Sequence, residues 1–363
     1  MTRIHGLDLA RALAIIGMMA AHIGPPRFLT DGYPAVLFAV LAGVSLGIIS
    51  SRTSSPVDAR LRLLTRAVIL IGLGVILAAL QFGIVIVLIA IGVSYVLLLP
   101  VLEWSTRRLL VLLAGLVVGG PLLGAAQSAL LIDWSSEFFS ELLFGAYPLT
   151  AWLAYTLLGL VLHRVALRRE VWLLVGGVAV FVLAQGILGA AHFRVTPGDE
   201  LNFLEEWLQG EPHTGGLLDV LSSAGFSTAI IGVCLLVCRV PVIVKALYPV
   251  RSFGAMSLTV YVAHVVITTL ANGTFVSATS FYGGEWHPGI DAEPGEYGWT
   301  MYFPPEVPEE SYLEPEFSDP LWPGLFVWQL IGFLVFASLW RWRFRRGPLE
   351  GGVHAVVART ATP

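Results

Sequence analysis

Charged side chains interrupt the first hydrophobic segment of the chain, residues 7–23. Asp8 and Arg11 lie near its start, three residues apart, and His22 lies near its end. A charged group at the centre of a bilayer costs roughly 2.5 to 3.5 kcal/mol on insertion scales, so such groups usually face a protein interior or a polar cavity. Asp and Arg at positions i and i+3 share one helical face and can neutralise each other. The segment therefore carries either a structural ion pair or part of a site.

Two histidines have the chemistry of a general base, because an imidazole exchanges protons near physiological pH. His22 stands at the end of the first segment, just before Gly24. His264 lies about eight residues into a later apolar segment, with Ser257 and Tyr261 at i−7 and i−3 on its own face. Each histidine can also be a hydrogen-bonded group with a purely structural role. The functional interpretation makes His22 and His264 catalytic, and Ser257 and Tyr261 binding residues.

The composition is that of a membrane protein. Of 363 residues, 56% are hydrophobic and 13% are charged, whereas a soluble domain has about 25% charged residues. We predict an all-α polytopic membrane bundle of ten, or eleven, transmembrane helices, in one domain over residues 1–346 with a tail at 347–363. Only three residues separate the third and fourth segments, so one of that pair can be re-entrant. The predicted spans are 7–23, 33–50, 66–82, 84–102, 109–126, 147–164, 171–191, 217–238, 256–275 and 323–340.

Basic residues predict the orientation, since Lys and Arg concentrate on the cytoplasmic side. All of the 21 basic residues except Arg27 and Arg194 fall at the termini or in alternate connecting segments. With ten spans, both termini are cytoplasmic. The segment 276–322 is then external; it contains ten acidic residues and no basic one. Its composition favours an ordered cap or a partly flexible lid over a separate domain.

Several common functions are excluded or given no support. No metal motif, phosphate loop, dinucleotide fingerprint or nucleophile elbow occurs where it would work, so we predict no metal site. Segregated charge and long apolar segments argue against a nucleic-acid role. Cys234 and Cys238 lie one helical turn apart, which suits a buried structural face. One lysine against twenty arginines is typical of a GC-rich bacterial coding bias, so we expect a bacterial plasma membrane protein.

Other polar and aromatic side chains have two interpretations each. Arg60, Arg62 and Arg66 precede the third apolar segment and either anchor it on the cytoplasmic side or bind an anionic cofactor. Trp152, with a tyrosine five residues before it, is typical of an interfacial aromatic belt but also suits a substrate site. His213 in an external loop is expected to be solvated. Asp31 is the only acid in the loop after the first segment.

Four stretches resemble a known family in the same order along the chain. They are RIHGLDLARALAIIGMMAAH (3–22), LFAVLAGVSLGI (37–48), YPLTAWLAYTLLGLVLHR (147–164) and GAMSLTVYVAH (254–264). The first is similar to the R-x-x-x-LDxxRG-x-A-x-x-x-M-x-x-x-(Asn/His) opening of the heparan-α-glucosaminide N-acetyltransferase-like membrane proteins and of a related bacterial family of uncharacterised function. The resemblance covers both ends of the chain and a middle section.

The resemblance implies transmembrane acyl transfer. A cytosolic acyl-CoA, usually acetyl-CoA, would give its acyl group to an amine or hydroxyl of a sugar or glycolipid of the cell envelope. The matching positions are the charged pair Asp8 and Arg11, His22 at the Asn/His site, and Gly254, Ser257, Tyr261 and His264 in the late motif. The chain departs from the family in two ways: residues 24–34 lack the external-loop histidine of active acetyltransferases, and Ala12 replaces the usual glycine.

Chemistry assigns the remaining roles. Acyl transfer needs a base, donors for the developing oxyanion and positive groups for the CoA phosphates. We expect His22 or His264 to be the base. The donor to the oxyanion is expected to be Ser257, Tyr261 or Arg11. The phosphates of acyl-CoA are expected to bind to the cytoplasmic-side arginines, which are Arg11, Arg60, Arg62 and Arg66. Trp152 and Asp31 complete the predicted substrate site. A homodimer is left open.

Two alternatives are a transporter or exporter of a small polar or lipid-linked solute, and a non-catalytic subunit whose acidic external loop binds a partner or cations. A cavity that narrows around paired histidines favours transfer, whereas a symmetric central site favours transport.

Overall fold

The structure is a computed structural model that describes residues 4–24, 32–53, 55–80, 84–129, 143, 145, 147–167, 169–191, 202–275 and 321–360. These residues form helices joined by turns, and no strand occurs among them. The all-α prediction is therefore confirmed for this part of the chain. Two predictions, the role of Asp31 and an ordered or partly flexible segment at 276–322, lie outside the described residues.

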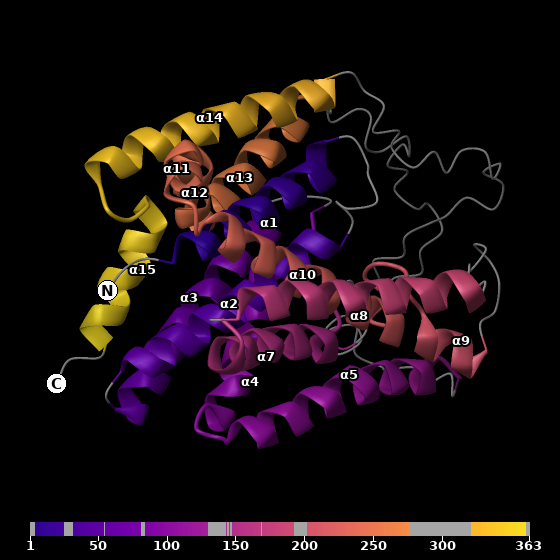
Figure 1. The fold of residues 1–363 in the computed structure, drawn as a ribbon. Coiled ribbons are helices and arrows are strands. Elements are labelled where there is room, and N and C mark those ends of the chain that lie inside the picture. The colour runs from indigo at the N-terminus through magenta and orange to yellow at the C-terminus, as the bar shows by residue number, and fades with distance from the viewer. Residues whose placement is uncertain are drawn as a thin grey trace, which may run out of the picture.

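Each of the ten predicted apolar segments corresponds to a helix (Figure 1). The ends agree within a few residues except for the third helix, which starts ten residues before the predicted span because Pro56 suits a first helical position and the arginines that follow extend beyond the apolar part. The ten helices are α1 (His5–Ile23), α2 (Tyr33–Arg52), α3 (Pro56–Leu80), α4 (Val87–Leu98), α5 (Thr106–Ala129), α7 (Leu149–Val165), α8 (Glu170–Ala191), α10 (Leu217–Val237), α13 (Ser257–Phe275) and α14 (Leu321–Arg343).

Shorter elements connect or flank these ten. They are the 3-10 turn η1 (Leu99–Val101) and the helices α9 (Phe203–Leu208), α11 (Pro241–Ala246), α12 (Tyr248–Ala255) and α15 (Pro348–Thr360). The predicted tail at 347–363 thus contains a helix, which packs against α3 and α13. The third and fourth segments are two separate helices packed along each other.

Seven of the described helices are long and apolar enough to cross a membrane: α1, α2, α3, α5, α8, α10 and α14. Helices α12 and α13 meet at an angle of 82°, and together they form an eighth span if the bent pair is counted as one. The helices α4 and α7 are apolar but shorter. The structure therefore supports a helical membrane protein, and the figure of ten spans stays a prediction.

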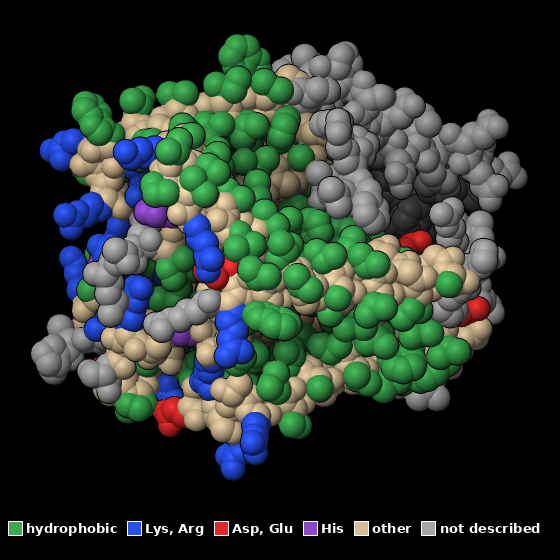
Figure 2. Space-filling model, viewed as in Figure 1, with side chains coloured by type: hydrophobic (Ala, Val, Ile, Leu, Met, Phe, Trp, Pro, Cys, Tyr) green, Lys and Arg blue, Asp and Glu red, His purple; other side chains and the backbone are tan. Residues whose placement is uncertain are grey.

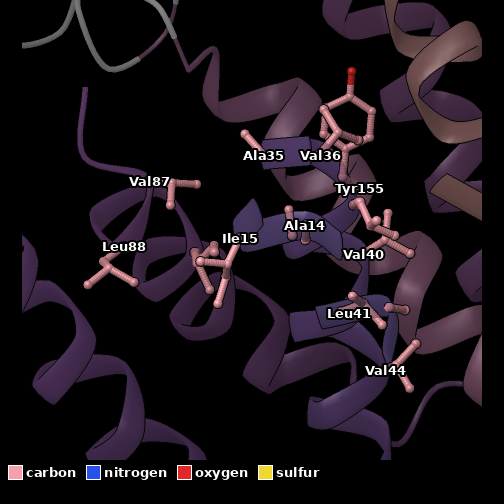
Figure 3. Packing of buried hydrophobic residues seen from close by; sticks show 14 of the residues in the cluster. Ala14, Ile15, Ala35, Val36, Val40, Leu41, Val44, Val87, Leu88 and Tyr155 are labelled. Atoms are coloured by element: carbon pink, nitrogen blue, oxygen red, sulfur yellow. The ribbon is translucent and has the colours of Figure 1, made fainter. Parts of the chain in front are cut away.

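Close backbone contact holds the centre of the bundle together. Helices α2 and α7 cross where Gly43 faces the backbone of Thr156 and Gly159 faces that of Val40, so that a Cβ at either glycine would collide with main-chain atoms. Around this crossing, small and branched side chains such as Ala14 and Val44 are fully buried (Figure 3). Without a side chain at the crossing the helices approach closely, which is how membrane helices gain packing energy.

The surface divides into an apolar face and a basic end. Large apolar side chains are exposed on α8 and α14, among them Trp172 at 73% and Trp328 at 75% exposure. In the view of Figure 2, Lys and Arg gather at the end of the molecule where Figure 1 places both termini. This is the distribution that a hydrocarbon belt and one basic aqueous face require.

Candidate functional site

The two predicted histidines are in direct contact. His22, in the last turn of α1, and His264, in the middle of α13, are 242 residues apart in sequence, yet His22 Nδ1 lies 3.1 Å from His264 Nε2. Their ring planes differ by only 4°, with centroids 5.4 Å apart. A face-to-face pair would have carbon atoms roughly 3.5 to 4 Å apart across the planes, which a 3.1 Å nitrogen contact does not allow. The rings are therefore edge to edge, joined by an in-plane hydrogen bond.

Two further polar side chains extend this contact into the protein. His264 Nδ1 lies 2.8 Å from Gln329 Oε1 of α14 and 3.3 Å from Thr268 Oγ1 of α13. Gln329 Nε2 donates to Thr268 Oγ1 at 3.2 Å. His264, Thr268 and Gln329 are all buried, whereas His22 is half-buried. We call these four residues the histidine relay.

The charged residues of α1 form a second polar group, nearer the basic end. Arg11 donates to Asp8 at 3.3 Å and to the hydroxyl of Ser45 in α2 at 2.8 Å. The Asp8 side chain is buried, and that of Arg11 is 22% exposed. Asp8 is fixed here because Gly254 of α12 lies against its backbone carbonyl. The predicted pair therefore exists, and it holds α1 against α2 as well as neutralising charge.

Arg11 also lines a cavity of about 470 Å³, its open mouth included. Arg66 from α3, Ser45 from α2, and Ser257 and Leu258 from the start of α13 contribute to the wall. Two arginines and three hydroxyl side chains, including that of Tyr95, lie beside apolar side chains here and suit an amphiphilic anion. We call this space the arginine cavity.

Aromatic side chains separate the arginine cavity from the histidine relay. Phe38 lines the cavity, and its ring lies 6.2 Å from that of Tyr261, nearly parallel. Tyr261 is fully buried one turn before His264, and its hydroxyl accepts a hydrogen bond from the Val87 backbone at 3.4 Å. The residues that line the cavity in the described part of the chain do not include either histidine. The histidines are paired, but the cavity does not narrow around them, so the arrangement that favours transfer is present only in its first part.

The three arginines before the third span have different surroundings. Arg66 lines the arginine cavity. Arg60 is exposed and forms an ion pair with Glu103 at 3.0 Å. Arg62 is half-buried on α3, which packs against α15. Of these three arginines, Arg66 is the one that lines the cavity.

Trp152 belongs to a second pocket, of about 270 Å³ with its open part, formed by α2, α7, α10 and the segment before α10. Trp152 is only 3% exposed, so the interpretation as an aromatic belt residue is wrong, because a belt residue faces the membrane interface and this ring is buried against Tyr147 and Tyr155. His213 is exposed, as expected for a loop residue, and it also lines this pocket. Its positive φ of 69° is unusual for a residue other than glycine. Asp219 adds a buried carboxylate that accepts from Ser223 at 3.1 Å.

Sequence reasoning missed Gln329, Thr268, Ser45 and Asp219. A signal existed for three of them. Asp219 is a charged residue inside the predicted span 217–238. Thr268 follows His264 by four residues and so shares its helical face, and Gln329 interrupts the apolar stretch 325–331. No local pattern marks Ser45, which is one of several small polar residues in apolar helices.

Comparison with known proteins leaves the family open. No family model matches the chain, and no curated protein sequence matches it significantly. The assignment of a function therefore rests on the chemistry of the histidine relay and the arginine cavity.

Proposed function

We propose that this chain is a membrane-embedded acyltransferase. It would take an acyl group, an acetyl group in the simplest case, from cytosolic acyl-CoA and give it to a sugar or glycolipid acceptor on the external side. The proposal includes ten spans, both termini in the cytoplasm and a bacterial plasma membrane. In that orientation the C-terminal end of α1, with His22, faces the external side, and the basic end faces the cytoplasm.

The observation that carries the proposal is the hydrogen bond between His22 and His264. Ionisable residues inside membrane helices are costly, and they usually have a functional reason. A pair of imidazoles provides a base whose proton can be shared with a second ring. This arrangement suits removal of a proton from a weakly acidic hydroxyl or from an attacking amine.

The reaction is a simple acyl exchange. The acceptor nitrogen or oxygen forms a bond to the thioester carbonyl carbon, and the bond from that carbon to sulfur breaks. The acceptor proton passes to His22 as the new bond forms. The proton then returns to the CoA thiolate, so the products are the acylated acceptor and free CoA with its thiol.

The arginine cavity supports the choice of acyl-CoA as co-substrate. Arg11 and His22 are eleven residues apart on α1, which is about 16 Å along a helix axis at 1.5 Å per residue. Phosphates bound by Arg11 and Arg66 would therefore leave a long thioester arm to reach toward the histidines. Phe38 and Tyr261 lie on that route, so the arm must displace or pass between their rings.

Turnover by the purified protein in lipid tests this proposal. We expect acetyl-, succinyl- or longer acyl-CoA to release free thiol only when a suitable sugar acceptor is present. Release should be lost in the His22→Ala and His264→Ala proteins and kept in His354→Gln, a matched control on α15. Full activity in both alanine variants, or no thiol release with any acyl-CoA, would rule the proposal out.

Export of a small polar or lipid-linked solute is a second candidate, favoured by one observation. Helices α12 and α13 form a broken apolar segment with an 82° bend, and Arg251 beside the break is only 7% exposed. Broken helices commonly form substrate sites in transporters. Solute flux into vesicles that contain the protein, without thiol release, would favour this candidate.

A further inference from the structure

The Gln329 amide fixes which nitrogen of His264 carries a proton. Gln329 Oε1 lies 2.8 Å from His264 Nδ1. A carbonyl oxygen only accepts hydrogen bonds, so His264 Nδ1 must donate. In this orientation the amide Nε2 donates to Thr268 Oγ1 at 3.2 Å.

With the Gln329 amide in this orientation, burial excludes the reverse tautomer of His264. If the His264 proton were on Nε2, the lone pair of Nδ1 would face the lone pairs of Gln329 Oε1 at 2.8 Å. Both side chains are buried: His264 is fully buried, and Gln329 is 6% exposed. Bulk water does not reach such a site, so the repulsion and the unsatisfied groups would not be compensated.

The tautomer of His264 determines which nitrogen of His22 carries a proton. A neutral imidazole has one donor and one acceptor nitrogen. With Nδ1 as the donor, His264 Nε2 is an acceptor, and His22 Nδ1, 3.1 Å away, must donate to it. The free lone pair of the two rings is then on His22 Nε2.

We propose that Gln329 is a positioning residue that sets both histidine tautomers and makes His22 Nε2 the basic atom of the pair. The catalytic consequence rests on the proposed acyl transfer, but the tautomers do not. When His22 Nε2 accepts a proton, the proton on His22 Nδ1 can move to His264 Nε2. His264 then carries the positive charge, with both of its N–H groups donating.

Gln329 also ends the proton path. A primary amide accepts a hydrogen bond but does not take up a proton at neutral pH, so among the residues that the structure describes, His22 is the ionisable partner through which a proton on His264 leaves. The histidine relay therefore holds one additional proton, which enters and leaves through His22. Such a relay suits a group transfer better than proton-coupled transport, which needs a path to both faces of the membrane.

Nitrogen NMR of the full-length protein in lipid, with ¹⁵N-labelled histidine, tests the inference without any substrate. Signals of His22 and His264 are assigned by their loss in His22→Gln and His264→Gln proteins. We expect both rings to show a protonated Nδ1 and an unprotonated Nε2. A protonated Nε2 in either neutral ring, or two doubly protonated rings at neutral pH, would overturn the inference.

Substitution of Gln329 tests its role directly. In Gln329→Leu, the Thr268 hydroxyl becomes free to donate to His264 Nδ1, so we expect an unprotonated Nδ1 signal to appear at His264. Gln329→Glu restores an oxygen acceptor and is expected to restore the protonated Nδ1. If the acyltransferase activity exists, Gln329→Leu should lower kcat about 10- to 100-fold, the usual effect of removing a histidine's orienting partner, and Gln329→Glu should recover part of it.

A control variant separates this role from general packing. Gln185 of α8 donates to the Tyr33 hydroxyl at 3.1 Å, so Gln185→Leu removes a comparable amide outside the histidine relay. This substitution should leave the two tautomers unchanged. Unchanged tautomers in Gln329→Leu as well would show that Gln329 does not set them.

Discussion

The histidine relay and the arginine cavity use residues at different levels along α1 and α13. They differ in charge and in how deeply their polar groups are buried. The relay joins α1 and α13 through uncharged, mostly buried groups in a continuous series of hydrogen bonds. The cavity lies nearer the basic end, among α1, α2, α3, α4 and the start of α13, and it is lined by two arginines, of which Arg11 is partly exposed. Hydrogen bonds are stronger in a dry interior, whereas burying a charge is costly. Each kind of chemistry is found where the protein can accommodate it.

This comparison teaches that proton handling and anion recognition can be separated along one helix pair. Phe38 and Tyr261 form the boundary between them. Substitutions on the two sides of this boundary should therefore affect different measured constants.

The largest effect is expected from the relay. His22→Ala and His264→Ala should each lower kcat for acyl transfer by about 10²- to 10⁴-fold, the usual contribution of a general base. The KM for acyl-CoA should change little, because the cavity is intact. Steady-state kinetics at varied acyl-CoA concentration measures both constants. A large rise in KM with kcat preserved would show that the histidines bind the ligand instead.

The next effect is expected from Arg66 in the cavity. Arg66→Met removes a charged donor, worth about 1.5 to 3 kcal/mol, so acyl-CoA should bind roughly 10- to 150-fold more weakly while kcat is largely kept. Arg60→Met is the matched control, because Arg60 is exposed and paired with Glu103. Titration calorimetry in lipid discs measures both. Equal losses in the two variants would indicate a general effect of surface charge.

A scaffold substitution should disturb both regions together. Gly254 packs against the Asp8 backbone, so Gly254→Ala forces α12 away from α1 and should destabilise the protein by about 1 to 3 kcal/mol. At Gly115 of α5 nothing lies within 4 Å of an added Cβ. Gly115→Ala should therefore be neutral or slightly stabilising. Thermal unfolding in detergent compares the two, and equal melting temperatures would contradict the close packing.

The smallest effect is expected at the N-terminal end of α13. Glu350 of α15 accepts from the backbone of Leu258 and Thr259 at 2.8 and 3.1 Å, and from the Thr259 hydroxyl at 2.6 Å. It therefore acts as an N-cap supplied by a distant helix. Glu350→Ala should cost about 0.5 to 2 kcal/mol, measured by thermal unfolding, and Glu350→Gln should cost less because it keeps an acceptor. The histidine tautomers should be unaffected, since the relay is two turns away.

Much of the fold was predictable because membrane helices are encoded locally. Ten apolar segments were predicted from composition along the chain, and each is helical in the structure. The bend of 82° between α12 and α13 was not predicted, because Ser252, Gly254 and Ser257 are compatible with a continuous helix. The two helices pack against different neighbours, α12 against α1 and α14 and α13 against α1 and α15, and this tertiary packing is not visible in the local sequence.

The candidate site was predictable in part. His22 and His264 were identified one at a time, from their cost inside a helix, and Asp8 and Arg11 from their spacing. The distinction between Arg66 and its neighbours Arg60 and Arg62 was not predictable, because all three precede the same span and differ only in the direction they face.

The sequence by itself determined the class of protein, the helical segments and the residue types able to do chemistry, because hydropathy and the cost of a buried charge act at each position separately. The tertiary structure decided which of these residues meet. The contact of His22 with His264, the completion of that pair by Gln329, and the position of Arg66 across from Arg11 all join side chains far apart along the chain. Such contacts depend on how helices pack side by side, and no local pattern encodes that packing.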